Sequence, residues 1–425
     1  MRLPAGLGAP PVLALVLAAF LGACDWFTGP DVVSLIVQVS TSGGSLDKDG
    51  YTVTLDGVAA GTVAVQDSLV IDSVATGSVS VGLEGIASNC SAAGPNPMLV
   101  HASEGGTGAA FHVVCRQQLA FMSDRDGTWD IFVVNEDGSG LEKLRGGPGN
   151  EYQPRWAPDG VRLAFVTSAG NPDLWILDYV HGGPEQAIST LPMSQVHAEW
   201  SPDGQTIAFA SAEPTEEWNL KAARADGSEV WNLTADPAND LWATWAPDGR
   251  RLAFTSWRDG NAEIYLVDAD GTNLTRLTTD PADDEYPDWS PSGDWIVFNS
   301  SRAGGYQVFK IRPDGSELVQ LTTGTSNLWP RWSPDATQIA ISQVGTNGLG
   351  VAVMHSDGTG LTVWTDGNVN DDRDLTWSPD GKWLAATRWW GGSVRKDILL
   401  INAGDGTTRV LTTAGIWNDF ADWRP

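Results

Sequence analysis

Trp200-Ser201-Pro202-Asp203-Gly204 is followed by the apolar run Ile207-Ala208-Phe209, and this succession of turn and strand recurs along the chain. The Trp-x-Pro element returns every 43 to 46 residues, at Trp156, Trp200, Trp245, Trp289, Trp332, Trp377 and Trp423. Pro presets the first corner of a turn, Asp accepts hydrogen bonds from turn amides, and Gly adopts a left-handed conformation without strain. We therefore interpret each copy as a hairpin with a large aromatic residue on the strand that enters it.

Each repeat contains further strands. An apolar strand follows the hairpin, a third one such as Ile264–Val267 closes on an Asp-Gly turn, and a short fourth one ends near Leu-Thr, as at Leu277-Thr278. Four strands in about 44 residues, covered on both faces, are typical of one blade of a β-propeller. The 48 Gly, 24 Pro and 21 Trp fit such short strands and tight turns better than helices. The fold class predicted is all-β, with a seven-bladed propeller over residues 116–425.

These motifs resemble the TolB-type propeller repeat over about 310 of the 425 residues. The resemblance implies a binding surface built on a closed ring of blades. TolB itself has six blades and an N-terminal α/β domain, whereas this chain has seven repeats and a different N-terminal part. The partner of TolB, the peptidoglycan-associated lipoprotein, is therefore not carried over to this chain.

The two ends of the repeat region are offset by one strand. The first repeat begins at its second strand, near Leu119, and the last strand, Phe420–Trp423, has no hairpin partner after it. We expect this last strand to complete the first blade, which would leave no open sheet edge in the ring.

The N-terminal residues have the features of a secretory signal. Arg2 precedes an apolar stretch, Pro11–Leu21, that is too short to span a bilayer and long enough for a signal sequence. The segment Leu21-Gly22-Ala23-Cys24 resembles the lipobox of bacterial lipoproteins, which implies cleavage of residues 1–23 and lipidation of Cys24. The alternative is a conventional signal with an ordinary cysteine. Residues 24–30 would then be a tether, and the chain a lipoprotein of the cell envelope that faces the periplasm or the cell surface.

Residues 31–115 are predicted to form a small β-sandwich. Alternating segments such as Val33–Val39, Tyr51–Leu55 and Ser78–Val81 are typical of half-buried strands. The segment looks like an immunoglobulin-like or transthyretin-like module. Once Cys24 is lipidated, Cys90 and Cys115 remain as an even pair, and we predict a disulfide between them because the compartment is oxidising. Two reduced buried thiols are the alternative.

The charge of the chain limits its partners. It has 53 acidic and 25 basic residues, for a formal net charge of −28. Such a surface repels nucleic acid and anionic headgroups. Self-repulsion that keeps a secreted protein soluble is one interpretation of this charge, and a cationic partner is the other. We expect a monomer.

The candidate binding residues lie three positions before each repeat Trp, on the strand nearest the propeller axis. Five of the seven are aromatic or His and are predicted to line the channel mouth: His197, Trp242, Tyr286, Trp329 and Phe420. Gln153 and Asp374 occupy the other two positions. Such a ring would suit a peptide, a sugar or a flat ligand. The alternative is that these side chains only pack between blades.

The sequence offers no catalytic constellation. The propeller region has three His residues, in different repeats, and neither a nucleophile elbow nor a phosphate loop is present. We therefore predict no catalytic residue, metal or cofactor, and hypothesise a non-enzymatic protein that binds an envelope protein or peptide. A carbohydrate-binding or carbohydrate-active protein that uses Glu199, Asp288 and Asp374 is one alternative, and a structural spacer is another.

Overall fold

The computed structural model describes residues 32–43, 50–87, 89–103, 107–146, 149–168, 173–182, 184–189, 194–212, 217–412 and 417–425. Within these ranges the regular structure consists of strands, β1 to β36, which confirms the all-β prediction. None of these residues belongs to a helix long and apolar enough to cross a membrane. Cys24, with the rest of the predicted signal and tether, lies outside the described residues.

The N-terminal part consists of two four-stranded sheets, β4-β1-β8-β6 and β3-β2-β5-β7. Alternate residues of both sheets point into one apolar core that includes Leu35, Val53 and Phe111. Cys90 lies opposite Cys115 across two paired strands, and the two form the expected disulfide. The strands are β1 (Val32–Gly43), β2 (Tyr51–Leu55), β3 (Val58–Val63), β4 (Ser68–Ala75), β5 (Gly77–Glu84), β6 (Cys90–Ala92), β7 (Met98–Ala102) and β8 (Thr107–Cys115).

Seven further four-stranded sheets form the blades of the propeller. The inner strands of blades 1 to 7 are β36 (Asn418–Trp423), β12 (Glu151–Trp156), β16 (Ser194–Trp200), β20 (Asp240–Trp245), β24 (Asp284–Trp289), β28 (Asn327–Trp332) and β32 (Asp371–Trp377). The second strands are β9 (Gln118–Ser123), β13 (Arg162–Thr167), β17 (Thr206–Ala212), β21 (Arg251–Ser256), β25 (Ile296–Ser300), β29 (Gln338–Val344) and β33 (Trp383–Trp389).

The outer half of each blade completes its sheet. The third strands are β10 (Asp130–Asn135), β14 (Asp173–Asp178), β18 (Asn219–Arg224), β22 (Glu263–Asp268), β26 (Gln307–Ile311), β30 (Leu349–His355) and β34 (Lys396–Asn402). The outermost strands are β11 (Glu142–Arg145), β15 (Gln186–Ser189), β19 (Val230–Asn232), β23 (Thr275–Arg276), β27 (Val319–Gln320), β31 (Thr362–Val363) and β35 (Thr408–Val410).

The ring closes as the sequence predicts. β36 pairs with β9, so that Trp423 lies opposite Leu119 and Asp422 opposite Ala120. One apolar cluster fills each of the seven interfaces between neighbouring blades, including the interface between blade 7 and blade 1. Because every inner face of a blade is covered by the next blade, the central strands are apolar on both faces.

The repeat motif explains this packing. In the second hairpin, Ser201 N–H donates to the carbonyl of Thr206, Asp203 accepts from the amide of Gln205, and Gly204 has φ of 65°. The Trp at the end of the inner strand is buried between blades, and four of the seven donate from Nε1 to a main-chain carbonyl of the preceding inner strand. The motif thus joins a tight turn to an anchor between neighbouring blades.

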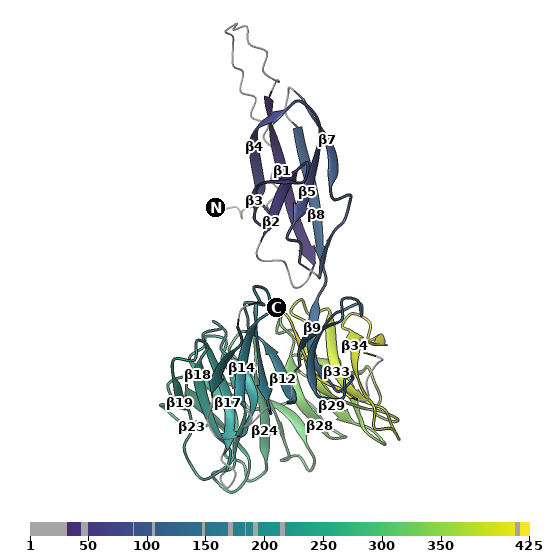
Figure 1. Ribbon diagram of the computed structural model, residues 1–425. Helices are drawn as coiled ribbons and strands as arrows, with labels where there is room; N and C mark the ends of the chain where they lie inside the picture. Colours follow the sequence, from purple (N-terminus) through teal and green to yellow (C-terminus); the bar gives the residue numbers. More distant parts are fainter. Residues whose placement is uncertain are drawn as a thin grey trace, which may run out of the picture.

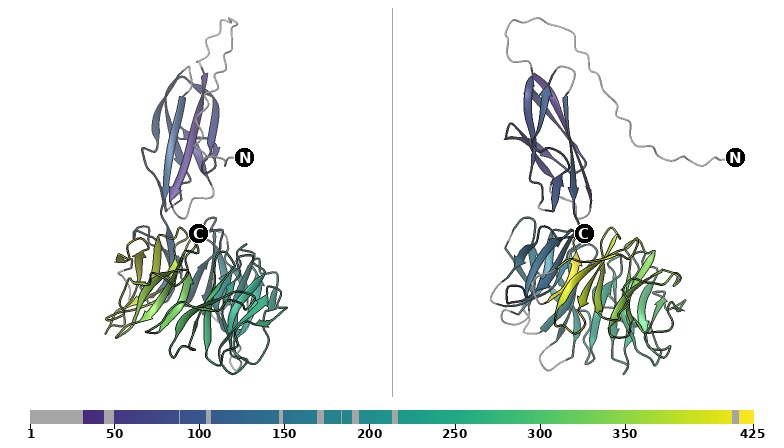
Figure 2. Two further views of the ribbon diagram at one scale, coloured as in Figure 1. Left: turned by 180° about the vertical axis from the view of Figure 1, so that it is seen from behind. Right: turned by 90° about the vertical axis from the view of Figure 1, so that its right-hand side faces the viewer.

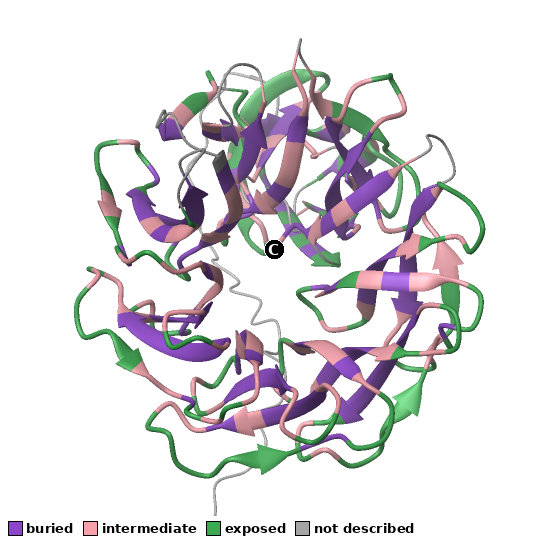
Figure 3. Ribbon diagram, turned by 90° about the horizontal axis from the view of Figure 1, so that it is seen from below, coloured by how far each residue is buried: buried purple, intermediate pink, exposed green. Residues whose placement is uncertain are grey.

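The two parts of the molecule lie end to end (Figures 1 and 2). β1 runs parallel to β8, and β8 leads into β9, so Val32 lies at the end of the sandwich that is remote from the propeller. The inner strands end on the face of the propeller that is next to the sandwich, where Pro425 also lies (Figure 1). They begin on the opposite face, which we call the distal face and which Figure 3 shows.

Candidate functional site

The residues three positions before each repeat Trp share an unusual backbone conformation. All seven have a left-handed φ, between 50° and 57°: Gln153, His197, Trp242, Tyr286, Trp329, Asp374 and Phe420. We call these seven residues the inner ring. Each lies where the pairing of the inner strand with the second strand shifts register, which marks a β-bulge. Bulges redirect side chains, and a left-handed conformation of a large non-glycine residue costs about 1 to 2 kcal/mol.

Four consecutive members of the inner ring contact one another. The ring centroids of His197 and Trp242 are 6.5 Å apart, Trp242 stacks on Tyr286 at 3.9 Å, and Tyr286 meets Trp329 edge-on at 5.9 Å. Gln153 joins this row because its Oε1 accepts a hydrogen bond from the amide of His197. The aromatic residues of blades 3 to 6 therefore form a continuous row around the axis.

Side chains at the distal ends of strands, and Trp417 directly before β36, extend this row into blades 7 and 1. The guanidinium of Arg373 lies 5.8 Å from the Trp329 ring and 5.1 Å from the Trp389 ring. The Lys396 ammonium lies 3.9 Å from Trp389 and 4.9 Å from Trp417. We call the whole set from His197 to Trp417 the aromatic belt. Trp389 is the last residue of β33 and Trp417 directly precedes β36, and neither was among the residues predicted from the sequence. A comparison of these strand ends between repeats is the signal that could have identified them.

The structure places the predicted residues unequally. His197, Trp242, Tyr286 and Trp329 are brought together and half-buried: their rings contact one another across neighbouring blades and keep some exposed surface. Phe420 packs against the core between blades 1 and 2. It is therefore the member of the predicted set that lies apart from the row.

The inner strands are held at their starting residues by buried ion pairs. Arg258 reaches Asp240 at 3.0 Å, Arg302 reaches Asp284 at 2.5 Å, and Arg388 reaches Asp372 at 2.7 Å; the aspartates are 0 to 1% exposed. Asp240, Asp284 and Asp372 each lie two residues before a member of the inner ring. These pairs therefore position the strands that carry Trp242, Tyr286 and Asp374.

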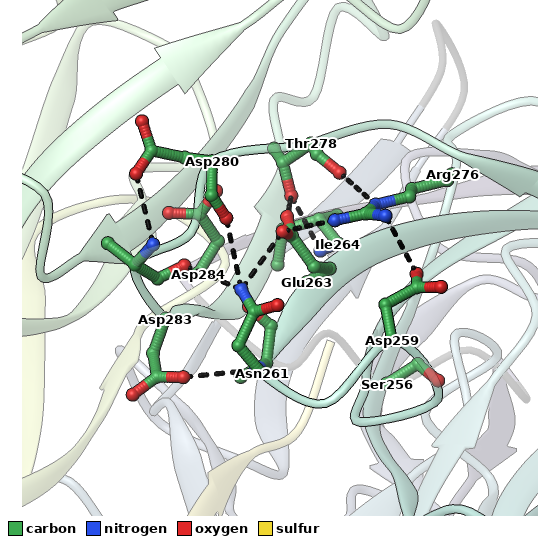
Figure 4. Close-up of polar contacts among 12 residues, drawn as sticks. Ser256, Asp259, Asn261, Glu263, Ile264, Arg276, Thr278, Asp280, Asp283 and Asp284 are labelled. Carbon is green, nitrogen blue, oxygen red and sulfur yellow. Dashed lines mark hydrogen bonds and ion pairs between the residues drawn. The ribbon is translucent and has the colours of Figure 1, made fainter.

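A second polar network links blades 4 and 5 on the same face (Figure 4). The buried carboxylate of Glu263 accepts hydrogen bonds from Arg276, Thr278 and Asn261. Asn261 also donates to the carbonyl of Asp280, in the loop that leads to the inner strand of blade 5. The network holds this loop in place. Its polar groups hydrogen-bond to one another, so we assign it a structural role in the blades.

Charged residues lie one position before the repeat Trp. Arg155 is 3.6 Å from Asp422, and Arg331 is 3.8 Å from Asp288. Burial raises the pKa of Glu199 to about 7, with nearby Asp422 and Asp288 adding to the effect and both arginines opposing it. Burial also lowers the pKa of His197 to about 4, so that the imidazole is neutral at pH 7.

The described residues contain no group of three or more His, Cys, Asp or Glu side chains placed to hold a metal ion. The inner ring presents the apolar surfaces and the hydrogen-bonding edges of its aromatic residues and of the neutral His197. It also presents the exposed carboxylate of Asp374. Such a surface binds by stacking and burial of apolar groups.

A family model described as the TolB beta propeller domain matches residues 96–241 and 237–425. The chain belongs to the TolB β-propeller family. A protein TolB homolog of Chlorobium luteolum is 36% identical over 145 residues, which are 34% of this chain and 33% of that protein. The chain thus matches about a third of the length of this curated TolB relative.

Two solved structures share the fold of the TolB-type propeller at low identity. A puromycin-hydrolyzing peptidase of Mycobacterium tuberculosis has a TM-score of 0.55 at 15% identity, and the match covers 70% of this chain and 53% of that one. An oligogalacturonate lyase in complex with manganese has a TM-score of 0.51 at 14% identity, and the match covers 69% of this chain and 85% of that one. These likenesses establish the fold alone.

Proposed function

We propose that this chain is a non-catalytic lipoprotein of the cell envelope whose propeller binds a protein or peptide partner through the inner ring on the distal face. The aromatic belt carries this proposal. Six blades contribute to it, and several of its aromatic side chains keep exposed surface although each contacts a neighbour. Tyr and Trp with partly exposed rings are enriched at the centres of protein interfaces.

The strained backbone supports the same proposal. A left-handed φ is rare for Trp, Tyr, Phe and His, yet it occurs at this position in every blade. Strain of this kind is often found where side chains must be aimed at a ligand. The bulge places these side chains toward the distal face, since Trp242 also meets Trp257 of the distal loop of blade 4 at 5.6 Å.

The arrangement of the two parts suits a lipid anchor at Cys24. Val32 lies at the far end of the sandwich, and β1 spans about 40 Å if its 12 residues each rise about 3.3 Å. An anchored chain would hold the propeller away from the membrane by roughly this length, with the aromatic belt on the face turned away from the bilayer. This geometry leaves the belt accessible to a partner in the envelope.

The proposal predicts the loss of a partner without the loss of the fold. The full chain is expressed in intact cells and cross-linked, and its partners are identified by mass spectrometry. Trp242→Ala combined with Trp329→Ala should abolish capture of the main partner and change the thermal midpoint by only a few degrees, because both side chains are half-buried. Trp295→Ala removes a half-buried Trp of the opposite face and should leave capture unchanged. Equal capture by both variants would contradict the proposal.

A carbohydrate ligand is the second candidate, and the raised pKa values of three acids favour it. Burial raises the pKa of Glu199 to about 7 and that of Asp288 to about 6. Partial loss of solvent around the carboxylate and the nearby charge of Asp419 raise the pKa of Asp374 to about 6, although its side chain keeps exposed surface. Such pKa values are suited to acid catalysis on glycosidic bonds. Incubation of the full chain with polysaccharides separates the two candidates. Release of products that Glu199→Gln abolishes would establish the second.

A further inference from the structure

Four exposed apolar side chains gather on the distal face of blades 6 and 7. Val369 is 66% and Val394 72% exposed, and Val344 and Trp389 are each 38% exposed. We call these four residues the blade 6–7 patch. All other exposed large apolar side chains of the described propeller lie in the outermost strands or in the turns that lead into them: Leu141, Val230, Leu274, Leu318, Val319, Leu361 and Val363. The patch is therefore a local feature and does not arise from the repeat.

The loops that carry the patch are packed against one another. The side-chain amide of Asn347 donates to the carbonyl of Asn368 at 2.6 Å, and the Asn368 side chain accepts from Thr346. A Cβ atom on Gly391 would lie 1.8 Å from the carbonyl oxygen of Val369, so only glycine allows this approach. The valines are thus presented on a platform of three interlocked loops.

The sequence of blade 7 departs from the regular blades at this place. In blades 1, 4 and 5 the distal loop reads Ser-x-Arg-x-Gly, and its arginine folds back onto the inner strand. In blade 7 the corresponding contact comes from Arg388, within β33, which pairs with Asp372. The end of β33 and the loop after it do not make this contact and carry Trp389 and Val394 instead.

The patch continues the aromatic belt. Arg373 lies between Trp329 of the inner ring and Trp389 of the patch. The four cations of this sector are already paired with carboxylates: Arg373 with Asp371, Arg388 with Asp372, Arg395 with Asp397, and Lys396 with Asp419.

Asp366, in the loop that carries Val369, and Asp374 are exposed acids of this sector, and neither forms an ion pair with a described side chain; Asp374 is the one that lies in the inner ring, beside Arg373. The charge that this sector offers to a partner is therefore negative, in line with the net charge of −28 of the whole chain.

We infer that the blade 6–7 patch is a second part of the partner site, and that it takes an extended peptide segment with an apolar side chain over the valines and a basic side chain toward Asp374. This inference rests on the proposed function and names the chemistry of its partner. Aliphatic valines bury apolar side chains and offer no hydrogen bonds to sugar hydroxyls, and the acidic surroundings repel anionic headgroups.

A displayed library of random linear peptides, selected on the full chain, tests this inference. The wild-type chain should enrich peptides that combine apolar and basic residues. Val369→Ser with Val394→Ser should weaken binding of those peptides about tenfold or more, because burial of one apolar side chain is lost. Asp374→Asn should remove the preference for basic residues. The matched control is Val319→Ser with Val363→Ser, which makes the same change on the outermost strands and should bind as wild type does.

The outcomes separate this inference from the proposed function. One outcome would overturn the inference and leave the proposed function standing. In it, the selected peptides lose binding when Trp242 and Trp329 are replaced but bind the valine variant as well as the wild type. No enrichment, or enrichment that survives loss of both tryptophans, contradicts the proposed function and the inference together. A wild-type dimer in sedimentation velocity that the valine variant lacks would assign the patch to a second copy of the chain and would also overturn the inference.

Discussion

Blade 5 and blade 2 are built on the same repeat, yet their inner strands begin differently. Asp284, the first residue of β24, is paired with Arg302 at 2.5 Å. Glu151, the first residue of β12, is 0% exposed, and neither of its carboxylate oxygens receives a hydrogen bond from the described residues. Both blades nevertheless carry the bulge, since Gln153 and Tyr286 have φ of 51° and 57°. The bulge therefore belongs to the repeat and forms with or without the ion pair. The ion pair of blade 5 compensates the buried charge of Asp284.

The largest expected effect comes from removing this compensation in blade 5. Arg302→Ala leaves the buried carboxylate of Asp284 without its counter-charge, and we expect the unfolding free energy to fall by about 3 to 5 kcal/mol. Urea unfolding followed by tryptophan fluorescence at pH 7 measures this change. Arg302→Ala combined with Asp284→Asn should recover part of the loss, because no buried charge is then left alone. A decrease in unfolding free energy of less than about 1 kcal/mol would mean that the ion pair contributes little to the stability of blade 5.

The comparison of the blades also shows what the sequence can predict. Seven copies of the repeat, and the offset of its two ends, are enough to place Trp423 beside Leu119. These features are periodic, and periodicity reports which residues share a core. In the N-terminal part, alternation in the sequence marks strands such as β2 (Tyr51–Leu55) but not β3 (Val58–Val63), which has few apolar residues facing the core.

The candidate site is harder to predict, for a physical reason. In a regular strand the side chains alternate, whereas the bulge at Trp242 and its equivalents breaks this alternation. Glycine is the usual signal for a left-handed residue, and the inner ring contains none. Trp389 ends β33 and Trp417 directly precedes β36, and an aromatic residue at these two places is not part of the repeat motif. The positions of the inner ring could thus be named from the sequence, but its contacts could not.

The unpaired acid of blade 2 should give a smaller, pH-dependent effect. Burial and nearby Asp130 raise the pKa of Glu151 to about 7, against the opposing charge of Arg145. Folding therefore favours the protonated carboxyl, and the stability that it allows is fully present below about pH 4.5 and is lost as pH rises from there through about 7. Glu151→Gln should lie within about 1 kcal/mol of the wild type at pH 5 and exceed its unfolding free energy by about 2 to 3 kcal/mol at pH 8.5.

Urea unfolding at several pH values checks this prediction. Glu142→Gln removes an exposed acid of the outermost strand of blade 1 and should leave the pH dependence of stability unchanged. Parallel curves for Glu151→Gln and the wild type between pH 5 and 8.5 would show that Glu151 has a partner that neutralises its charge. Blade 2 would then resemble blade 5 after all.

The smallest expected effect concerns the repeat Trp itself, which occurs with and without its hydrogen bond. Trp245 and Trp332 are buried to the same degree. Nε1 of Trp245 donates to the carbonyl of Glu199 at 3.1 Å, whereas Nε1 of Trp332 is buried and has no acceptor among the residues that the structure describes. Phe in either place removes the same atoms and keeps an aromatic ring between the blades. Trp245→Phe also gives up a bond between blades, and Trp332→Phe removes a donor that the fold leaves unsatisfied. We expect Trp245→Phe to cost about 1 kcal/mol more than Trp332→Phe in urea unfolding. Equal losses would mean that the Trp anchors its blade by the volume of its ring alone.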